Sequence, residues 1–166
     1  MNKVQFFYAY ECPFCKKGFD TLAELLPHFP ETEIEWKPVE LNPGPAGEAA
    51  DPRIQGCYAA IELGADMIKF HDLLFRAIFN ERHNTDDLEV LGSIAGKLVD
   101  RAKFMELLKS GKYASKAAEN NDLAYEHEGI WYVPAFRAGK LKLDSEGGVG
   151  VSKEDLKAFL EKAKKG

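Results

Sequence analysis

Residues 4–26 read VQFFYAYECPFCKKGFDTLAELL, so two cysteines three positions apart directly follow an apolar run. The run VQFFYAY predicts a β-strand. Behind the cysteines, apolar residues recur at helical spacing and predict a helix from near Pro13 to about Leu26. These apolar residues are Phe19, Leu22, Leu25 and Leu26. The pair Cys12 and Cys15 therefore lies where a strand is followed by a helix.

The predicted start of this helix gives the two thiols different roles. Pro13 falls at the first helical position, where its missing N–H costs nothing. Cys12 is then at or beside the N-cap, where unpaired N–H groups and the positive end of the helix dipole favour a thiolate. We expect a lowered pKa for Cys12, which makes it the attacking sulfur. Cys15 lies one turn further on, within bonding distance, and can resolve a mixed disulfide.

Three interpretations of the cysteine pair compete. A zinc site usually needs a second CxxC motif or a histidine pair, but Cys57 stands alone in the sequence. The histidines are scattered without ligand spacing, at His28, His71, His83 and His127. A second interpretation is that Cys12 and Cys15 are simply small, buried apolar side chains. Cys57 likewise has two interpretations, a buried inert thiol or one partner of a regulatory disulfide. Thiol redox chemistry is the interpretation we favour, because a CxxC motif between a strand and a helix is the thioredoxin-type arrangement.

Length and charge limit the classes of protein. The 166 residues, 45% apolar and 30% charged, suffice for one core with a sizeable insertion. The net charge of −5 argues against nucleic acid as a partner. The first apolar stretch stops at Glu11, after about eight residues, and indicates neither a membrane segment nor an export signal. We therefore expect a cytoplasmic protein, and in the reducing cytosol a structural disulfide is unfavourable. The sequence leaves the oligomeric state open.

A second feature lies far downstream, in GIWYVPAFRAGKLKL at residues 129–143. The pattern predicts two short strands, IWYVPAFRA and KLKL, joined around Gly139. Pro134 interrupts the first of them. One interpretation is an ordinary trans proline at the start of a strand; the other is a cis proline that faces the CxxC pair, as in thioredoxin-like folds.

The remaining segments complete an α/β pattern. Residues 31–43 predict a strand with a bend at Pro38, and residues 152–165 predict a closing helix with Ser152 as its N-cap. The middle is helical by its periodicity, with a break near Gly64 and a helix that Thr85 would cap ahead of Asp87 and Leu88. We predict a thioredoxin-like fold with a central mixed sheet, formed by residues 1–44 and 127–166, with a large all-helical insertion over 45–126.

Three motifs carry a family resemblance: CPFC at residues 12–15, LLFRAIF at 73–79 and VPAF at 133–136. The chain resembles DsbA-type thioredoxin-fold oxidoreductases over nearly its whole length, in particular their cytosolic branch resembling FrnE. The resemblance implies thiol–disulfide exchange with protein or small-molecule substrates, as an oxidase, reductase or isomerase. It implies a redox-active disulfide, Cys12–Cys15, no bound cofactor or metal, and glutathione as a candidate co-substrate.

The resemblance also implies roles for individual residues. Cys12 is the expected nucleophile and Cys15 the resolving thiol. Val133 and Pro134 form the expected cis-proline element that contacts substrate, together with Pro13 and Phe14. Strong oxidants of this family carry histidine between the cysteines, whereas Phe14 cannot donate a hydrogen bond.

The alternative function is that of a glutathione-dependent transferase or isomerase acting on small molecules, from the kappa-class-transferase-like branch of the same fold. That branch replaces the first cysteine with serine, so the intact Cys12 argues against it.

Overall fold

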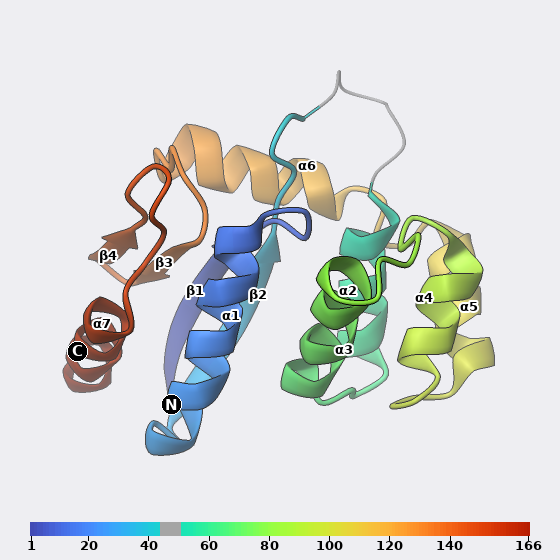
Figure 1. The fold of residues 1–166 in the computed structure, drawn as a ribbon, viewed down its shortest axis with the longest axis horizontal. Helices are drawn as coiled ribbons and strands as arrows, with labels where there is room; N and C mark the ends of the chain where they lie inside the picture. The colour runs from blue at the N-terminus through green and yellow to red at the C-terminus, as the bar shows by residue number, and fades with distance from the viewer. Residues whose placement is uncertain (44–50) are drawn as a thin grey trace. The chain divides into compact units, whose positions relative to one another are not determined.

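The computed structural model describes residues 1–43 and 51–166. Its chain, traced in Figure 1, divides into two compact units. One unit combines Met1–Val39 with Asp122–Gly166, and the other is Glu40–Asn121. The domain boundary expected between residues 44 and 45 lies outside the described residues.

The first unit contains a four-stranded mixed sheet in the order β2-β1-β3-β4. β1 (Asn2–Tyr8) pairs in parallel with β2 (Thr32–Pro38) and antiparallel with β3 (Ala135–Ala138). β3 pairs antiparallel with β4 (Leu141–Asp144). The central position of β1 is visible in Figure 1. The predicted fold class, a thioredoxin-like mixed sheet with a helical insertion, is confirmed.

An aromatic layer covers one face of this sheet. Phe6 of β1 stacks on Phe136 of β3, with ring centroids 4.9 Å apart, and meets Trp36 of β2 edge-on at 6.0 Å. From the helices, Phe19 lies 6.3 Å from Trp36 and Phe159 lies 6.2 Å from Phe136. Since large aromatic rings bury the most apolar area per residue, this layer fixes where the two helices lie.

The two helices that carry these rings are α1 (Pro13–Leu25) and α7 (Lys153–Lys165). α1 begins at its N-cap Cys12 and is followed by the short 3₁₀ helix η1 (Leu26–His28). At the start of α7 the Ser152 hydroxyl accepts from the Asp155 N–H at 3.1 Å. The sequence predicted both helices, and the Ser152 cap is confirmed.

Two predicted strands are longer than the observed ones. β3 begins at Ala135, and residues 130–134 do not belong to a strand. β2 ends at Pro38 instead of bending there and continuing. Pro134, directly ahead of β3, has no N–H to donate to a ladder. After Pro38 the backbone pairing runs one bond further, since the Val39 N–H donates to the Tyr8 carbonyl at 2.7 Å.

The second unit is helical over its described residues. Its helices are α2 (Pro52–Glu62), α3 (Met67–Phe79), α4 (Leu88–Ala95), α5 (Arg101–Ser110) and α6 (Lys116–Asn121). The predicted break near Gly64 is confirmed, and Gly64 has a φ of +77°, which favours glycine. The predicted Thr85 cap is wrong: Asp87 is the N-cap of α4 and accepts from the Glu89 N–H at 2.8 Å. Asp87 directly precedes the helix, whereas Thr85 is buried.

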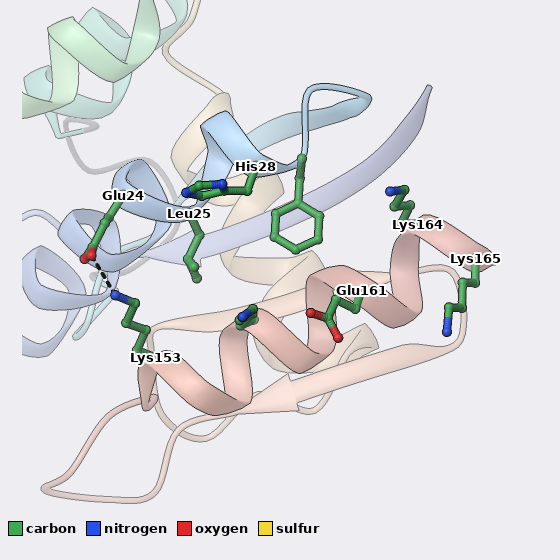
Figure 2. Close-up of a pocket in the computed structure, with 9 residues that line it drawn as sticks. Glu24, Leu25, His28, Lys153, Glu161, Lys164 and Lys165 are labelled. Carbon is green, nitrogen blue, oxygen red and sulfur yellow. Dashed lines mark hydrogen bonds and ion pairs between the residues drawn. The ribbon is translucent and has the colours of Figure 1, made fainter.

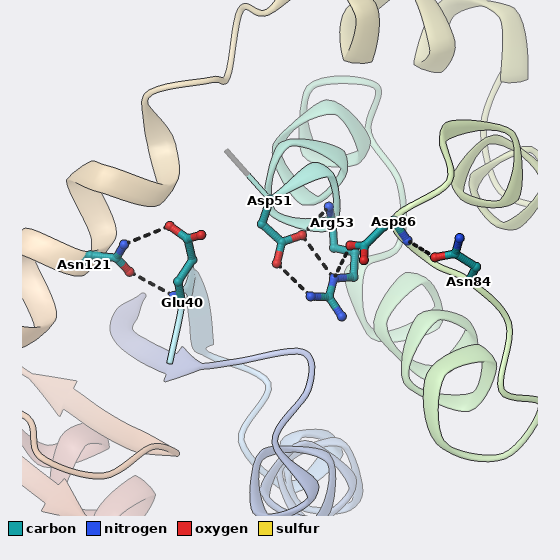
Figure 3. A network of polar contacts seen from close by, with 6 residues as sticks. All are labelled: Glu40, Asp51, Arg53, Asn84, Asp86 and Asn121. Atoms are coloured by element: carbon teal, nitrogen blue, oxygen red, sulfur yellow. Dashed lines mark hydrogen bonds and ion pairs between the residues drawn. The ribbon is translucent and has the colours of Figure 1, made fainter. Parts of the chain in front are cut away.

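The residues at which the chain enters and leaves this unit bind each other (Figure 3). The Glu40 N–H donates to Asn121 Oδ1 at 2.9 Å, and Asn121 Nδ2 donates to the Glu40 carboxylate at 3.1 Å. Near the start of α2, the Asp51 carboxylate caps the helix and holds the Arg53 guanidinium at 2.9–3.0 Å. Asp86 lies 3.7 Å from the same guanidinium. The Glu40–Asn121 contacts therefore hold the unit's two ends together.

Among the residues that the structure describes, Arg137 on β3 is the largest side chain that is almost fully buried, with 2% of its surface exposed. Its guanidinium lies 2.8 Å from the Asp144 carboxylate and 3.4 Å from that of Glu128, and it donates to the Phe136 carbonyl at 3.0 Å. A buried cation is tolerated only where such partners surround it. Glu128 belongs to the segment that leads to Pro134, so this ion cluster supports that segment.

No helix in residues 1–43 and 51–166 is long and apolar enough to cross a membrane.

Replacing Arg137 by alanine should lower the free energy of unfolding by about 3 kcal/mol, because Glu128 and the buried carbonyl lose their partner. The matched control is Arg76→Ala, which removes an exposed pair of similar length, 2.7 Å to Asp72. It should cost about 0.5 kcal/mol or less. Urea unfolding followed by circular dichroism measures both, and equal losses would contradict the prediction.

Candidate active site

Cys12 is the N-cap residue of α1, as the sequence predicted. Its backbone is extended, with φ −93° and ψ 116°, and its Sγ accepts from the Cys15 N–H at 3.3 Å. The Cys15 N–H also donates to the Cys12 carbonyl at 3.1 Å, so the Cys12 sulfur is its second acceptor. The same contact favours negative charge on the sulfur.

The environment of Cys12 lowers its pKa from 9.0 to about 7. The largest cause is a hydrogen bond from the Cys15 side chain; burial opposes it, and hydrogen bonds from the backbone of Cys15 and Phe14 add to it. The negative charge of Glu11 opposes the shift weakly. Cys12 therefore has more thiolate character at neutral pH than an ordinary cysteine, and thiols with a pKa near the ambient pH are the fastest attackers of disulfides.

Cys15 has the opposite character. It is completely buried on the inner side of α1, and its Sγ accepts from the Ala9 N–H at 3.4 Å. Burial raises the pKa of the Cys15 thiol well above its ordinary value, and the hydrogen bond and negative charge of Cys12 raise it further. The pair thus contains one reactive and one protected sulfur, and both are reduced in the structure.

The second predicted motif lies beside the first. The Val133 carbonyl oxygen is 3.8 Å from Cys12 Sγ, and the Val133–Pro134 peptide bond is cis. Pro134 packs directly on α1, because a Cβ placed on Gly18 would lie only 3.0 Å from Pro134 Cγ. The structure therefore brings Cys12, Cys15, Val133 and Pro134 together from sequence positions more than 100 residues apart.

The surface around this cluster is apolar and exposed. Phe14, between the cysteines, is 38% exposed, and Pro13 beside it is also exposed. Trp131 and Tyr132, just ahead of Val133, are 89% and 56% exposed. Exposed aromatic side chains beside a reactive group are typical of surfaces that bind a partner.

No motif in the sequence predicts a role for residues 145–151, which read SEGGVGV. In the structure, the Ser145 hydroxyl donates to the Pro134 carbonyl at 2.5 Å, and Gly147 and Gly150 lie against Tyr132 and Phe14. The only signal in the sequence was the density of glycine directly after a predicted strand.

The third cysteine is in the helical unit. Cys57 on α2 is completely buried, and its Sγ lies 4.0 Å from Nε2 of the equally buried His71. Burial lowers the pKa of His71 to about 3, so the ring is neutral and its Nδ1 bonds the Met67 carbonyl at 2.8 Å. Over the described ranges, no three His, Cys, Asp or Glu side chains converge as a metal site.

A groove of about 580 Å³ lies at the other end of α1 (Figure 2). Its lining combines the end of α1, η1 and one side of α7, and it includes Leu25, Phe29, His28, Glu24, Glu161 and the lysines 153, 157, 164 and 165. In Figure 2 the Lys153 ammonium reaches Glu24, at 2.6 Å. The length of α1, about 20 Å at 1.5 Å per residue, separates this groove from Cys12.

Comparison with known proteins agrees with this geometry. Residues 3–71 match the family described as DSBA-like thioredoxin domain. Over 98% of both chains, the protein is 24% identical to the uncharacterized protein YwbO of Bacillus subtilis (strain 168).

Two solved structures extend the comparison to the whole fold. A candidate protein disulfide isomerase from Nitrosomonas europaea superposes with a TM-score of 0.78 at 14% identity, over 97% of this chain and 96% of that one. Reduced DsbA1 from Neisseria meningitidis superposes with a TM-score of 0.69 at 17% identity, over 98% and 84%. The chain has the DsbA-like thioredoxin fold. In this DsbA-like fold the matched region contains both Cys12 and Cys15.

The lowered pKa of Cys12 predicts the pH dependence of its alkylation. The rate should rise with pH and reach half of its maximum near pH 7, because only the thiolate reacts. Iodoacetamide labelling at a series of pH values, read by peptide mass spectrometry, measures this midpoint.

In the control variant Cys15→Ser, which replaces the side chain responsible for the largest lowering, the midpoint should change. Cys15 and Cys57 should remain unlabelled in the folded protein, since both are fully buried. In the unmodified protein, an alkylation midpoint of Cys12 near the ordinary thiol value of 9.0 would refute the assignment of Cys12 as the reactive sulfur.

Proposed function

We propose that this protein is a thiol–disulfide oxidoreductase that uses Cys12 and Cys15 on protein or small-thiol substrates. The observation that carries the proposal is the asymmetric pair itself. Cys12 has a pKa of about 7 at the N-cap of α1, and Cys15 is a buried thiol one turn away. The first reacts readily at neutral pH, and the second is close enough to complete the exchange.

The exchange follows from this arrangement. The Cys12 thiolate attacks one sulfur of a substrate disulfide, a Cys12–substrate disulfide forms, and the other substrate sulfur leaves as a thiolate that takes up a proton. Cys15 then loses its proton and attacks Cys12 Sγ, which releases the second substrate thiol. Two electrons have passed to the substrate, and the protein holds a Cys12–Cys15 disulfide. The reverse sequence oxidises a dithiol.

The contacts with substrate come from the groups around Cys12, of which Pro13 and Phe14 are exposed and Val133 and Pro134 are buried. The backbone of Val133 lies outside any strand and 3.8 Å from Cys12 Sγ, so it is placed to bind the main chain of a substrate. Pro134, Pro13 and Phe14 provide an apolar border next to it. A substrate held there would present its sulfur to Cys12, and positioning of this kind accounts for much of the rate in exchange reactions.

The character of Cys12 bears on the direction of exchange. A pKa of about 7 resembles that of thioredoxin, whereas strongly oxidising proteins stabilise their thiolate much further. The side chain of Phe14, between the cysteines, cannot donate a further hydrogen bond to the sulfur. A reductase with a potential that suits the cytosol is the form we favour, within the branch resembling FrnE. Glutathione is its candidate co-substrate, and small-molecule transfer to glutathione is the alternative activity.

The proposed activity is tested by the reduction of insulin disulfides in the presence of dithiothreitol. Cys12→Ser should reduce turnover to background, because the remaining thiols of Cys15 and Cys57 are completely buried and cannot replace it. Cys15→Ser, reduced and then mixed with insulin after the dithiothreitol has been removed, should stop after the first attack and accumulate a mixed disulfide that non-reducing electrophoresis detects. Cys57→Ser is the matched control and should retain activity. Full activity in Cys12→Ser would exclude the proposal, and glutathione conjugation that survives in Cys15→Ser would favour the alternative.

The reduction potential of the pair should lie nearer to about −270 mV than to about −120 mV, since the Cys12 thiolate is only moderately stabilised. Equilibration with glutathione buffers, followed by mass spectrometry of trapped thiols, measures it in the Cys57→Ser variant. A value close to −120 mV would show that groups other than those around Cys12 in the reduced structure determine the equilibrium.

A further inference from the structure

The segment from Ser145 to Val151 connects β4 to the N-cap of α7 and forms a closed turn. The Glu146 N–H donates to the Gly150 carbonyl at 3.2 Å, and the Gly150 N–H donates to the Glu146 carbonyl at 3.0 Å. Gly148 and Gly150 have φ values of +76° and +86°, which side-chain-bearing residues rarely adopt. Backbone bonds thus define the shape of this segment.

Ser145 joins the turn to the redox site. The last pair of the β3–β4 ladder is Ala135 with Asp144. One residue beyond it, the backbone of Pro134 has no N–H to offer, and the Ser145 hydroxyl donates to the Pro134 carbonyl at 2.5 Å in a buried position. The serine side chain therefore takes the place of the next ladder bond and holds the peptide next to Val133.

Two glycines of the turn lie against the aromatic side chains that border Cys12. A Cβ on Gly147 would come within 2.8 Å of Tyr132 Cζ, which is closer than real contacts allow. A Cβ on Gly150 would lie 3.5 Å from the Phe14 side chain. The turn is thus the surface on which the Tyr132 ring rests, and it also touches Phe14 of the CPFC motif.

We propose that the segment Ser145–Val151 is a positioning element of the redox site, in which Ser145 holds the Val133–Pro134 backbone against Cys12 and Gly147 sets the place of the Tyr132 ring. The inference rests on the proposed exchange function and deepens it. Neither residue touches a reacting sulfur. They act through Val133, whose carbonyl lies 3.8 Å from Cys12 Sγ, and through a half-exposed aromatic ring on the substrate side.

The reaction is sensitive to such positioning because attack on a disulfide requires the substrate sulfur to be aligned with the thiolate. The lowered pKa of Cys12 arises from α1 itself. Loss of the Ser145 hydroxyl should therefore weaken the binding and alignment of substrate without changing the reactivity of the free thiolate. A fall in activity toward substrate at an unchanged alkylation midpoint of Cys12 therefore distinguishes the positioning role from a general loss of structure.

The test compares Ser145→Ala with Ser145→Thr, which keeps a hydroxyl, and with Ser110→Ala. Ser110 is the matched control: its hydroxyl also donates to a backbone carbonyl, that of Leu107, at 2.6 Å, but in the helical unit. Insulin reduction gives kcat and KM, iodoacetamide labelling gives the pH midpoint of Cys12, and thermal unfolding sets a temperature at which all variants are folded.

We expect kcat/KM for insulin to fall about tenfold in Ser145→Ala, the size expected for one buried hydrogen bond, chiefly through KM. The alkylation midpoint should stay where it is in the unmodified protein. Ser145→Thr should recover most of the activity, and Ser110→Ala should be unchanged. Unchanged kcat/KM in folded Ser145→Ala would overturn the positioning role.

Gly147→Ala provides a second variant if Ser145→Ala does not fold. It leaves the hydrogen bond intact and displaces the Tyr132 ring, so KM for insulin should rise while the alkylation midpoint holds; an unchanged KM would count against the proposal. Absence of exchange in the unmodified protein would instead refute the proposed function, and this inference with it. Exchange that is equal in all variants would overturn the positioning role alone.

Discussion

The packing of α1 against the aromatic face of the sheet is the constraint on which the rest of the site depends. Phe19 packs against Trp36. Pro134 packs so closely on Gly18 that a Cβ at this position would lie only 3.0 Å from Pro134 Cγ. Because Trp36 and Pro134 both pack against the helix, the position of its first turn is fixed. Cys12 Sγ then lies 3.3 Å from the Cys15 backbone nitrogen of that turn and 3.8 Å from the Val133 carbonyl oxygen. A shift of the helix would change the chemistry of the sulfur as well as the packing.

The sequence was sufficient wherever a local rule determined the outcome. The N-cap position of Cys12 follows from Pro13 and the helical spacing behind it, and the Ser152 cap and the break at Gly64 follow in the same way. The fold class followed from the order of strands and helices. Thr85 was chosen as a cap because threonine caps helices well, but Asp87 stands nearer to the helix and its carboxylate takes the N–H.

What the sequence did not show depends on contacts between distant residues. The role of residues 145–151 depends on a serine hydroxyl that meets a carbonyl 11 residues earlier in the chain, and on glycines that face rings elsewhere in the unit. No periodicity encodes such a contact. The length of β3 was overestimated for a related reason: the apolar run from Ile130 suits a strand, but Pro134 ends the pairing and Trp131 and Tyr132 turn to the surface. The exposed aromatic side chains are therefore a departure from the local pattern, and they lie at the site.

Of the influences that raise the pKa of Cys15, the two that come from Cys12 disappear during the reaction. Burial is permanent, but the hydrogen bond and the negative charge come from Cys12 as a thiolate. Once Cys12 is bonded to another sulfur it carries no charge, so the Cys15 thiol gives up its proton more easily than before. The first bond formation thereby switches on the second nucleophile. The order of the two attacks follows from this pair. Cys15 is unreactive while Cys12 is a free thiolate, and it becomes reactive once Cys12 is bonded to a substrate.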